Sequence, residues 1–263
     1  MRLAVLKYLS QKSIFIATNC SLYCLGCPFS KKSVQSKIEF ISPDLNAEAH
    51  SFIQKLSKPT MVNVIGGDPI LSKDSLSILR QLKSDGHYTR FWTTGIESEL
   101  IYSQLLPFID ELFLFLPSGD SENYRELTGR DYLDLLMTRI SFFKDQKVPL
   151  SINCPVLPIN FPFLPELYDI IYEYKLPLLL HVPKSSELPK ETMDWVYRFQ
   201  KIESVTIIKT RLSHRSQSEI SCPMVPYHPS LTNLQTAYLG LQEYYAKVRK
   251  KLSLTFFLKR HFG

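Results

Sequence analysis

Six short apolar runs alternate with amphipathic stretches along the chain, and this alternation limits the folds open to it more than any other feature. We predict strands at 13–18, 61–65, 87–94, 112–116, 150–154 and 178–182. The stretches between them carry apolar residues at helical spacing, for example Leu76, Leu79 and Leu82. Strands and helices that alternate in this way favour a parallel sheet with right-handed crossovers. The sequence therefore predicts an α/β fold.

Length and composition agree with a globular protein of this class. A chain of 263 residues suits one large domain, or one domain with a small appendage, and 44% hydrophobic residues allow a substantial core. The five cysteines are odd in number, which favours a reducing compartment over a disulfide framework. No run reaches the roughly 18 apolar residues of a membrane-spanning helix. We therefore expect a soluble, cytoplasmic protein without a transmembrane segment.

Three cysteines stand close together directly after the first predicted strand. Cys20, Cys24 and Cys27 have the spacing CxxxCxxC, so their thiolates can hold three corners of one soft inorganic cluster. A four-iron cluster has four corners, so one iron is left open to bind a small ligand. The alternatives are a disulfide pair with one spare cysteine, or a zinc site that lacks its fourth ligand.

A second motif follows the second predicted strand and has the sequence Gly66-Gly67-Asp68-Pro69. The two motifs, in this order and each after a strand, resemble those of the radical S-adenosylmethionine (radical SAM) superfamily. The resemblance implies a partial (β/α)6 barrel, with the barrel core at 1–183 and a short, mostly helical C-terminal extension at 184–263. A closed eight-stranded barrel is the alternative, because 204–209 has the composition of a further strand.

The resemblance also implies cofactors and the residues that bind them. A [4Fe-4S] cluster would be held by the three cysteines, and S-adenosylmethionine would bind the open iron. The residues expected to contact S-adenosylmethionine are Gly66, Gly67, Asp68, Pro69, Ser118 and Asn153. Two positions depart from the family pattern. Gly26 stands where an aromatic residue is common, which leaves Phe29 as a candidate for adenine packing, and Asp68 replaces the usual glutamate.

Several other residues have more than one interpretation. The stretch 124–130 resembles a YRxLTGR-type loop of the family. Cys154 is interpreted as a small core residue. Cys222 is interpreted as structural, with donation of hydrogen to a substrate radical as the alternative. His181 is either a satisfied core histidine or a substrate contact. No catalytic residue is assigned.

The resemblance implies reductive cleavage of S-adenosylmethionine to a 5′-deoxyadenosyl radical, which abstracts hydrogen from a substrate. The sequence does not identify the substrate. A small molecule, a peptide, a nucleic acid and a protein all stay open as substrate classes. An activating enzyme for glycyl-radical enzymes is one alternative. A non-catalytic iron-sulfur or metal-binding protein is an alternative of another class. An electron donor such as flavodoxin or ferredoxin is the implied partner.

The C-terminal tail carries the net charge of the chain. After Glu243 it has six basic residues and no acidic one. Its charge therefore equals the formal net charge of the whole chain, +6. Phe256, Phe257 and Phe262 are interleaved with these charges. We expect the tail either to hold an anionic partner or to be a solvated helix end.

Overall fold

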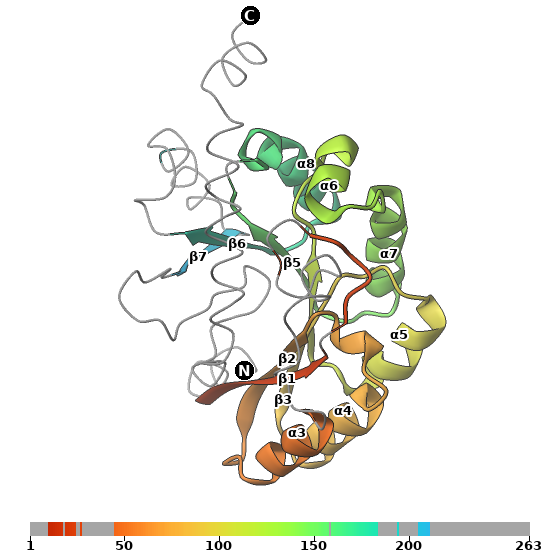
Figure 1. The fold of residues 1–263 in the computed structure, drawn as a ribbon, viewed down its shortest axis with the longest axis vertical. Helices are drawn as coiled ribbons and strands as arrows, with labels where there is room; N and C mark the ends of the chain where they lie inside the picture. The colour runs from red at the N-terminus through yellow and green to blue at the C-terminus, as the bar shows by residue number, and fades with distance from the viewer. Residues whose placement is uncertain are drawn as a thin grey trace, which may run out of the picture.

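Seven parallel strands form one sheet in this protein, and they lie in the order of the chain (Figure 1). The computed structural model describes residues 10–17, 19–24, 27, 45–157, 159–183, 194 and 205–210. Each strand pairs in parallel with the next one along the chain. The strands are β1 (Ser10–Ala17), β2 (Thr60–Gly66), β3 (Tyr88–Thr93), β4 (Glu111–Phe115), β5 (Leu150–Pro155), β6 (Leu178–Pro183) and β7 (Val205–Thr210).

The described helices lie along one side of the sheet (Figure 1). They are α3 (Leu45–Gln54), α4 (Ser75–Ser84), α5 (Glu99–Leu105), α6 (Ser121–Thr128), α7 (Leu133–Asp145) and α8 (Leu164–Tyr174). Three short 3-10 turns join these elements: η1 (Pro69–Leu71), η2 (Leu106–Phe108) and η3 (Phe161–Phe163). Each crossover from β1 to β6 contains a helix, as is usual in a parallel sheet, because the chain must return to the same end of the sheet before the next strand begins.

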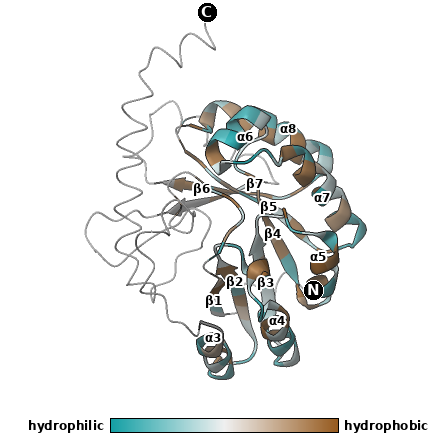
Figure 2. Ribbon diagram, turned by 45° about the vertical axis from the view of Figure 1, so that its right-hand side comes forward, coloured by the Kyte–Doolittle hydropathy of each residue, from teal (hydrophilic) through white to brown (hydrophobic). Residues whose placement is uncertain are grey.

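The main core lies between the sheet and these helices. Alternate residues of the strands, such as Val62 and Val64, are buried there with the apolar stripe of α4 that includes Leu79 and Leu82. Colouring by hydropathy shows mainly apolar strands and helices that mix apolar and polar residues (Figure 2). This pattern is typical of helices that bury one face against a sheet.

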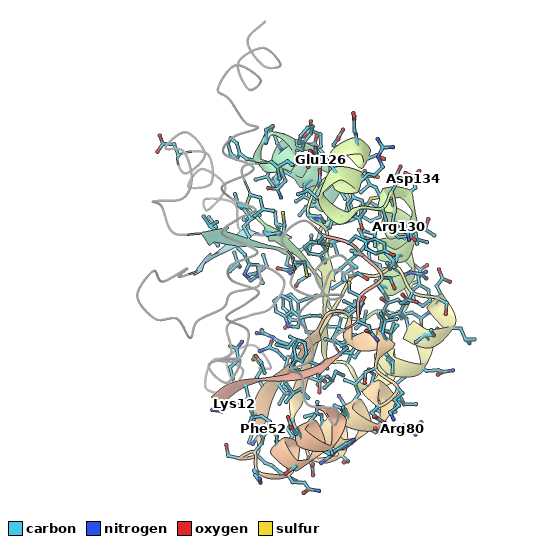
Figure 3. All side chains as sticks on the ribbon, viewed as in Figure 1. Lys12, Phe52, Arg80, Glu126, Arg130 and Asp134 are labelled. Carbon is cyan, nitrogen blue, oxygen red and sulfur yellow. The ribbon has the colours of Figure 1, made fainter. Side chains whose placement is uncertain are left out.

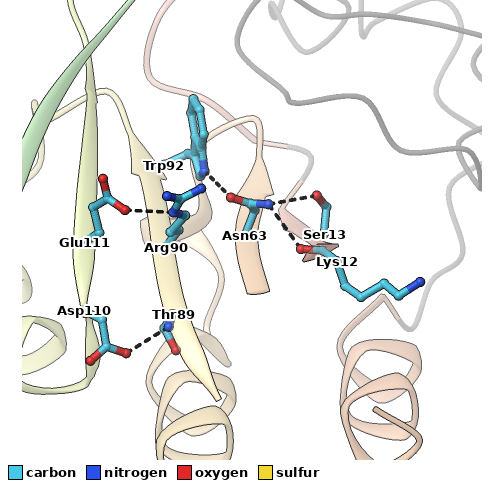
Figure 4. A network of polar contacts seen from close by, with 8 residues as sticks. All are labelled: Lys12, Ser13, Asn63, Thr89, Arg90, Trp92, Asp110 and Glu111. Carbon is cyan, nitrogen blue, oxygen red and sulfur yellow. Dashed lines mark hydrogen bonds and ion pairs between the residues drawn. The ribbon is translucent and has the colours of Figure 1, made fainter. Parts of the chain in front are cut away.

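The opposite face of the sheet is polar near the amino ends of the strands. Ser13, Asn63, Arg90 and Glu111 form one row across β1 to β4 in the pairing register. Arg90 Nε donates to Glu111 Oε2 at 2.7 Å, and Asn63 Nδ2 donates to the Lys12 carbonyl oxygen at 3.2 Å (Figure 4). The polar groups on this face are therefore paired with one another.

The next row toward the carboxyl ends is aromatic. Trp92 and Phe113 stack with ring centroids 4.2 Å apart, and Trp92 Nε1 donates to Asn63 Oδ1 at 3.2 Å (Figure 4). Ile65 packs against the same two rings. These contacts form a packed apolar surface near the carboxyl end of the sheet, beside the loops that carry the two motifs.

The six predicted strands and the α/β fold class are confirmed. The strand predicted at 204–209 is also present as β7, which pairs with β6. Within the described ranges no pairing joins β7 to β1, so the sheet is an open, partial barrel. β7 falls in the segment assigned to the C-terminal extension, and the division of the chain at residue 183 stays a prediction.

The loop predicted at 124–130 is wrong, because Ser121–Thr128 forms helix α6. Asp120 caps this helix by accepting a hydrogen bond from the Asn123 backbone nitrogen, and Gly129 ends it with a φ of 72°. Phe29, Cys222 and the basic tail lie outside the described residues. In the part of the chain that is described, no helix has both the length and the apolar composition needed to cross a membrane.

Candidate active site

The cysteine loop and the glycine loop lie side by side at the carboxyl ends of β1 and β2. The Gly67 nitrogen donates to the Ala17 carbonyl oxygen at 2.7 Å, and the Asp68 nitrogen donates to the Asn19 carbonyl oxygen at 2.7 Å. A Cβ atom at Gly66 would lie 2.5 Å from the Ala17 carbonyl oxygen, so only glycine fits beside this strand end. The two motifs therefore form one surface, as expected for loops at the same end of parallel strands.

The three cysteines of the motif are gathered in one small apolar cluster. Cys20 and Cys24 are buried with Leu22 and Phe115, and the partly buried Cys27 packs against them. Among the described residues, no three His, Cys, Asp or Glu side chains are placed to hold one common metal ion. A four-iron cluster makes a different demand, because each thiolate binds a separate iron.

Burial keeps the thiols of Cys20 and Cys24 protonated while no metal is bound. Burial, followed by the nearby Asp68 carboxylate, raises the pKa of Cys20 to about 12. Burial, followed by Cys27 and Cys20, raises the pKa of Cys24 well above its usual value. Iron binds the thiolate form, so binding would release these protons and neutralise the charge that burial disfavours. The donor set therefore fits an iron-sulfur cluster.

Two other segments hold the cysteine loop from its sides. Ser21 Oγ donates to Glu97 Oε1 at 2.6 Å, in the loop after β3. The Tyr23 nitrogen donates to the Thr128 carbonyl oxygen at 2.8 Å, at the end of α6. The guanidinium of Arg130, which Figure 3 labels, lies 5.0 Å from the centre of the Tyr23 ring. The loop conformation is thus fixed by residues far away in the sequence.

Gly129 permits the close approach of the α6 end to the cysteine loop, which leads to a prediction. A Cβ atom at Gly129 would lie 2.8 Å from the Tyr23 Cβ atom. Gly86 has a similar φ of 76° but no atom within 4 Å of the added Cβ. Both alanine variants carry a cost of about 1 kcal/mol from the positive φ. Gly129→Ala should lose about 1–3 kcal/mol more in urea unfolding, because the added atom overpacks the contact. Equal losses would contradict this close contact.

Asp68 supports the glycine loop through its side chain. The carboxylate is 1% exposed and accepts hydrogen bonds from the Ile70 nitrogen, the Thr93 hydroxyl and both the nitrogen and hydroxyl of Thr94. Burial raises the pKa of Asp68 to about 6, although these donors act in the opposite direction. Pro69 begins η1 next to it and is also buried. Because the carboxylate is occupied in this way, the groups that remain for a ligand are the backbone groups of the loop.

A small hollow opens beside the glycine loop. Its lining consists of Gly66, Gly67, Trp92, Thr93, Phe113, Phe115 and Asn153. Asn153 is 2% exposed and its Oδ1 atom has no hydrogen-bond partner, so it is free to accept one from a ligand. Ser118 is not among the lining residues, and its hydroxyl accepts a hydrogen bond from the Asp120 nitrogen at 3.1 Å. Contact of either residue with S-adenosylmethionine stays a prediction.

Two buried side chains near the ends of β5 and β6 differ in whether their polar atoms have hydrogen-bond partners. The Cys154 thiol lies 3.7 Å from the Pro117 carbonyl oxygen and 3.7 Å from Asn160 Nδ2, in agreement with a core role. His181 is buried with its ring 6.1 Å from the Trp92 ring, and its Nε2 atom has no partner. His181 is therefore not a satisfied core histidine.

Burial lowers the pKa of His181 to about 4, and this shift predicts a pH dependence of stability. The folded chain keeps the imidazole neutral, whereas the unfolded chain binds a proton below pH about 6.5. Stability should therefore fall by up to about 3 kcal/mol as the pH drops from about 6.5 to about 4. His181→Gln should remove this part of the fall in urea unfolding at each pH. His87 also has a lowered pKa through burial, but it is present in both proteins. Parallel pH curves for the two proteins would contradict the shift.

The sequence did not identify the residues that shape the loops. Glu97, Tyr23 and the Asp68 partners Thr93 and Thr94 were not expected to act together. The one available signal was the YRxLTGR-type stretch, which contains Thr128 and Arg130 and meets Tyr23. The nitrogen and the hydroxyl of Thr94 both donate to Asp68.

Solved structures with the same fold are radical SAM enzymes. SuiB of Streptococcus suis bound to S-adenosylmethionine has a TM-score of 0.59 at 18% identity, covering 80% of this chain and 53% of SuiB. SuiB bound to its precursor peptide SuiA gives 0.58 at 17% identity, covering 81% and 52%. The native structure of anSMEcpe with bound AdoMet gives 0.52 at 18% identity, covering 66% and 50%. The chain thus spans about half the length of these proteins.

These comparisons confirm, at the level of the fold, the resemblance to the radical SAM superfamily that the cysteine and glycine motifs indicated. No protein-family model and no curated protein matches the chain.

Proposed function

We propose that this chain is a radical SAM enzyme that cleaves S-adenosylmethionine reductively at a [4Fe-4S] cluster held by Cys20, Cys24 and Cys27. The observation that carries the proposal is the hydrogen-bonded junction of the cysteine loop with the glycine loop at Gly67 and Asp68. When bound, the cluster supplies the electron for the cleavage, and the resulting 5′-deoxyadenosyl radical abstracts hydrogen from the substrate.

The residues around the junction have separable roles in this proposal. Gly66 and Gly67 lack side chains, so their backbone groups are open to the amino group of S-adenosylmethionine. Asp68 fixes the shape of that backbone through its four hydrogen bonds. Asn153 offers an unpaired carbonyl oxygen to the ribose or the carboxylate end of the ligand. The aromatic lining, which includes Trp92, keeps water from the reacting atoms.

The substrate class and the partners are wider proposals. SuiB has been solved with the precursor peptide SuiA and anSMEcpe with the Kp18Cys peptide, which supports a peptide as one class to test. Small molecules and proteins are the other classes, including the glycyl-radical enzyme that an activating enzyme would modify. A flavodoxin or ferredoxin would supply electrons in the cytoplasm. The basic tail remains a candidate surface for an anionic partner.

Anaerobic reconstitution with iron and sulfide tests the cluster. The chain should become brown and hold about four irons, as one four-iron cluster requires. S-adenosylmethionine should then change the electron paramagnetic resonance spectrum of the reduced cluster, because it binds the open iron. A colourless protein that takes up one zinc would overturn the proposal. A cluster whose spectrum does not respond to S-adenosylmethionine would instead favour a non-catalytic carrier.

A further inference from the structure

Two buried polar atoms, on neighbouring strands of the sheet, have no hydrogen-bond partner. They are Asn153 Oδ1 on β5 and His181 Nε2 on β6, and the two residues are 2% and 4% exposed. A buried polar group without a partner costs free energy, so such groups in folded proteins call for an explanation. Asn153 already has a place in the proposed reaction, whereas His181 has none.

The order of side chains along β6 places His181 on the face of the sheet opposite the helices. Successive side chains of a strand alternate between its two faces. Leu178 and Leu180 belong to the main core between the sheet and the helices, whereas Leu179 packs with Trp92 on the opposite face. His181 is two residues beyond Leu179 and shares its face. The ring of His181 lies 6.1 Å from the ring of Trp92 in an edge-to-face arrangement, in agreement with this placement.

On this face His181 lies next to the proposed cofactor site. In the register of β5 and β6, Asn153 pairs with Leu179 and the following inward residue, Pro155, pairs with His181. Asn153 and Trp92 both line the hollow beside the glycine loop, and His181 does not. His181 is therefore adjacent to that hollow without being part of its lining, which is the position of a substrate contact more than of a cofactor contact.

His87 shows what a buried histidine with a structural role looks like in this chain. It is 3% exposed, and its Nε2 atom also has no partner. Its Nδ1 atom, however, accepts a hydrogen bond from the Thr60 nitrogen at 3.2 Å. This contact lies at the amino ends of β2 and β3, at the opposite end of the sheet from the two motif loops. His87 is therefore a suitable comparison for His181.

The surroundings of His181 favour an uncharged polar group as its ligand. Burial lowers the pKa of His181 to about 4, so the imidazole is neutral at neutral pH and can form one hydrogen bond at Nε2. The neighbouring side chains on this face, Trp92 and Leu179, offer no counter-charge. Arg90 on the same face is already paired with Glu111. A charged ligand group would lose its water here without compensation, whereas an amide or a hydroxyl would lose much less.

We propose that His181 binds the substrate through a hydrogen bond between its Nε2 atom and an uncharged amide or hydroxyl group of that substrate. The inference rests on the proposed function, because it needs S-adenosylmethionine in the neighbouring hollow. A substrate held next to that hollow would lie within reach of the 5′-deoxyadenosyl radical, and such positioning is what hydrogen abstraction requires. His181 would hold the substrate and would not itself react.

The first test measures the melting temperature of the cluster-free chain at neutral pH. His181→Leu replaces the imidazole with an apolar side chain of similar size, and because Nε2 has no partner, the variant should melt at the wild-type temperature or higher. His87→Leu is the matched control and should melt lower, since it loses the bond to the Thr60 nitrogen. If His181→Leu melts as low as this control, the imidazole supports the fold and the inference is overturned.

The second test titrates the cluster-free chain with acetamide and with acetate, which are similar in size but differ in charge. The signals of the histidine ring nitrogens are followed by nuclear magnetic resonance at neutral pH, and the His181→Leu variant identifies those of His181. Acetamide should shift the His181 signals in a saturable way and leave those of His87 in place, and acetate should shift neither. No response to acetamide, or an equal response to acetate, would overturn the inference.

The third test separates substrate binding from cofactor binding in the reconstituted proteins. The S-adenosylmethionine concentration that half-saturates the change in the electron paramagnetic resonance spectrum should agree within about twofold between His181→Leu and the wild type. A rise of about tenfold in the variant would make His181 a cofactor contact, which overturns the inference and leaves the proposed function standing. A wild-type cluster that does not respond to S-adenosylmethionine would overturn both.

Discussion

Cys24→Ser is expected to abolish the cluster and, with it, all cleavage of S-adenosylmethionine. The hydroxyl is a much harder ligand than a thiolate and does not ionise at neutral pH, so one corner of the cluster would lose its ligand. The substitution replaces one atom and changes the side-chain volume little, so the barrel should still fold. Anaerobic reconstitution followed by iron analysis should give far less than the about four irons of the wild type.

Cys154→Ser is the matched control for this variant. Cys154 is also buried, and its thiol lies near the Pro117 carbonyl oxygen and Asn160, so its surroundings already include polar groups. This variant should bind iron like the wild type. If Cys24→Ser keeps a full cluster, or if both variants lose iron equally, the assignment of the cluster ligands is wrong.

Asp68→Ala is expected to cause a large loss of stability. It removes the acceptor of four hydrogen bonds and leaves the nitrogens of Ile70 and Thr94 buried without a partner. The substitution also removes the unfavourable free energy of burying a charged carboxylate. The same burial raises the pKa of Asp68 to about 6. We therefore expect a net loss of about 3 kcal/mol in the free energy of unfolding, measured with urea on the cluster-free chain.

Asp120→Ala is the reference variant against which the loss of stability in Asp68→Ala is compared. Asp120 caps α6 through one bond to the Asn123 nitrogen at 2.8 Å, and removal of such a cap costs about 1 kcal/mol. Asp68→Ala should exceed it clearly. Equal losses in the two variants would mean that the carboxylate of Asp68 does not hold the glycine loop in the way described.

The strands and the two motifs were predictable because their signals are local. Apolar runs such as 61–65 and 112–116 stand out from their neighbours, and each motif directly follows a strand. A parallel sheet then brings the loops after β1 and β2 to the same end. The fold class and the meeting of the cysteines with Gly66 and Gly67 therefore follow from the order of the elements along the chain.

The groups that shape the site were not predictable, because each depends on contacts between distant segments. Helix α6 has few apolar residues and begins at the cap made by Asp120, so the sequence lacks a clear apolar stripe that would indicate a helix there. The residue type of Asp68 indicated a ligand contact, and only the positions of Thr93 and Thr94 show that its carboxylate is occupied.

The formation of 5′-deoxyadenosine tests the proposed function most directly. The reconstituted wild-type chain, given S-adenosylmethionine and a strong reductant without oxygen, should form 5′-deoxyadenosine and methionine in equal amounts. Cys24→Ser should form neither, and Cys154→Ser should match the wild type. A wild-type chain that carries its four-iron cluster and forms no 5′-deoxyadenosine would contradict the proposal that this chain is a radical SAM enzyme.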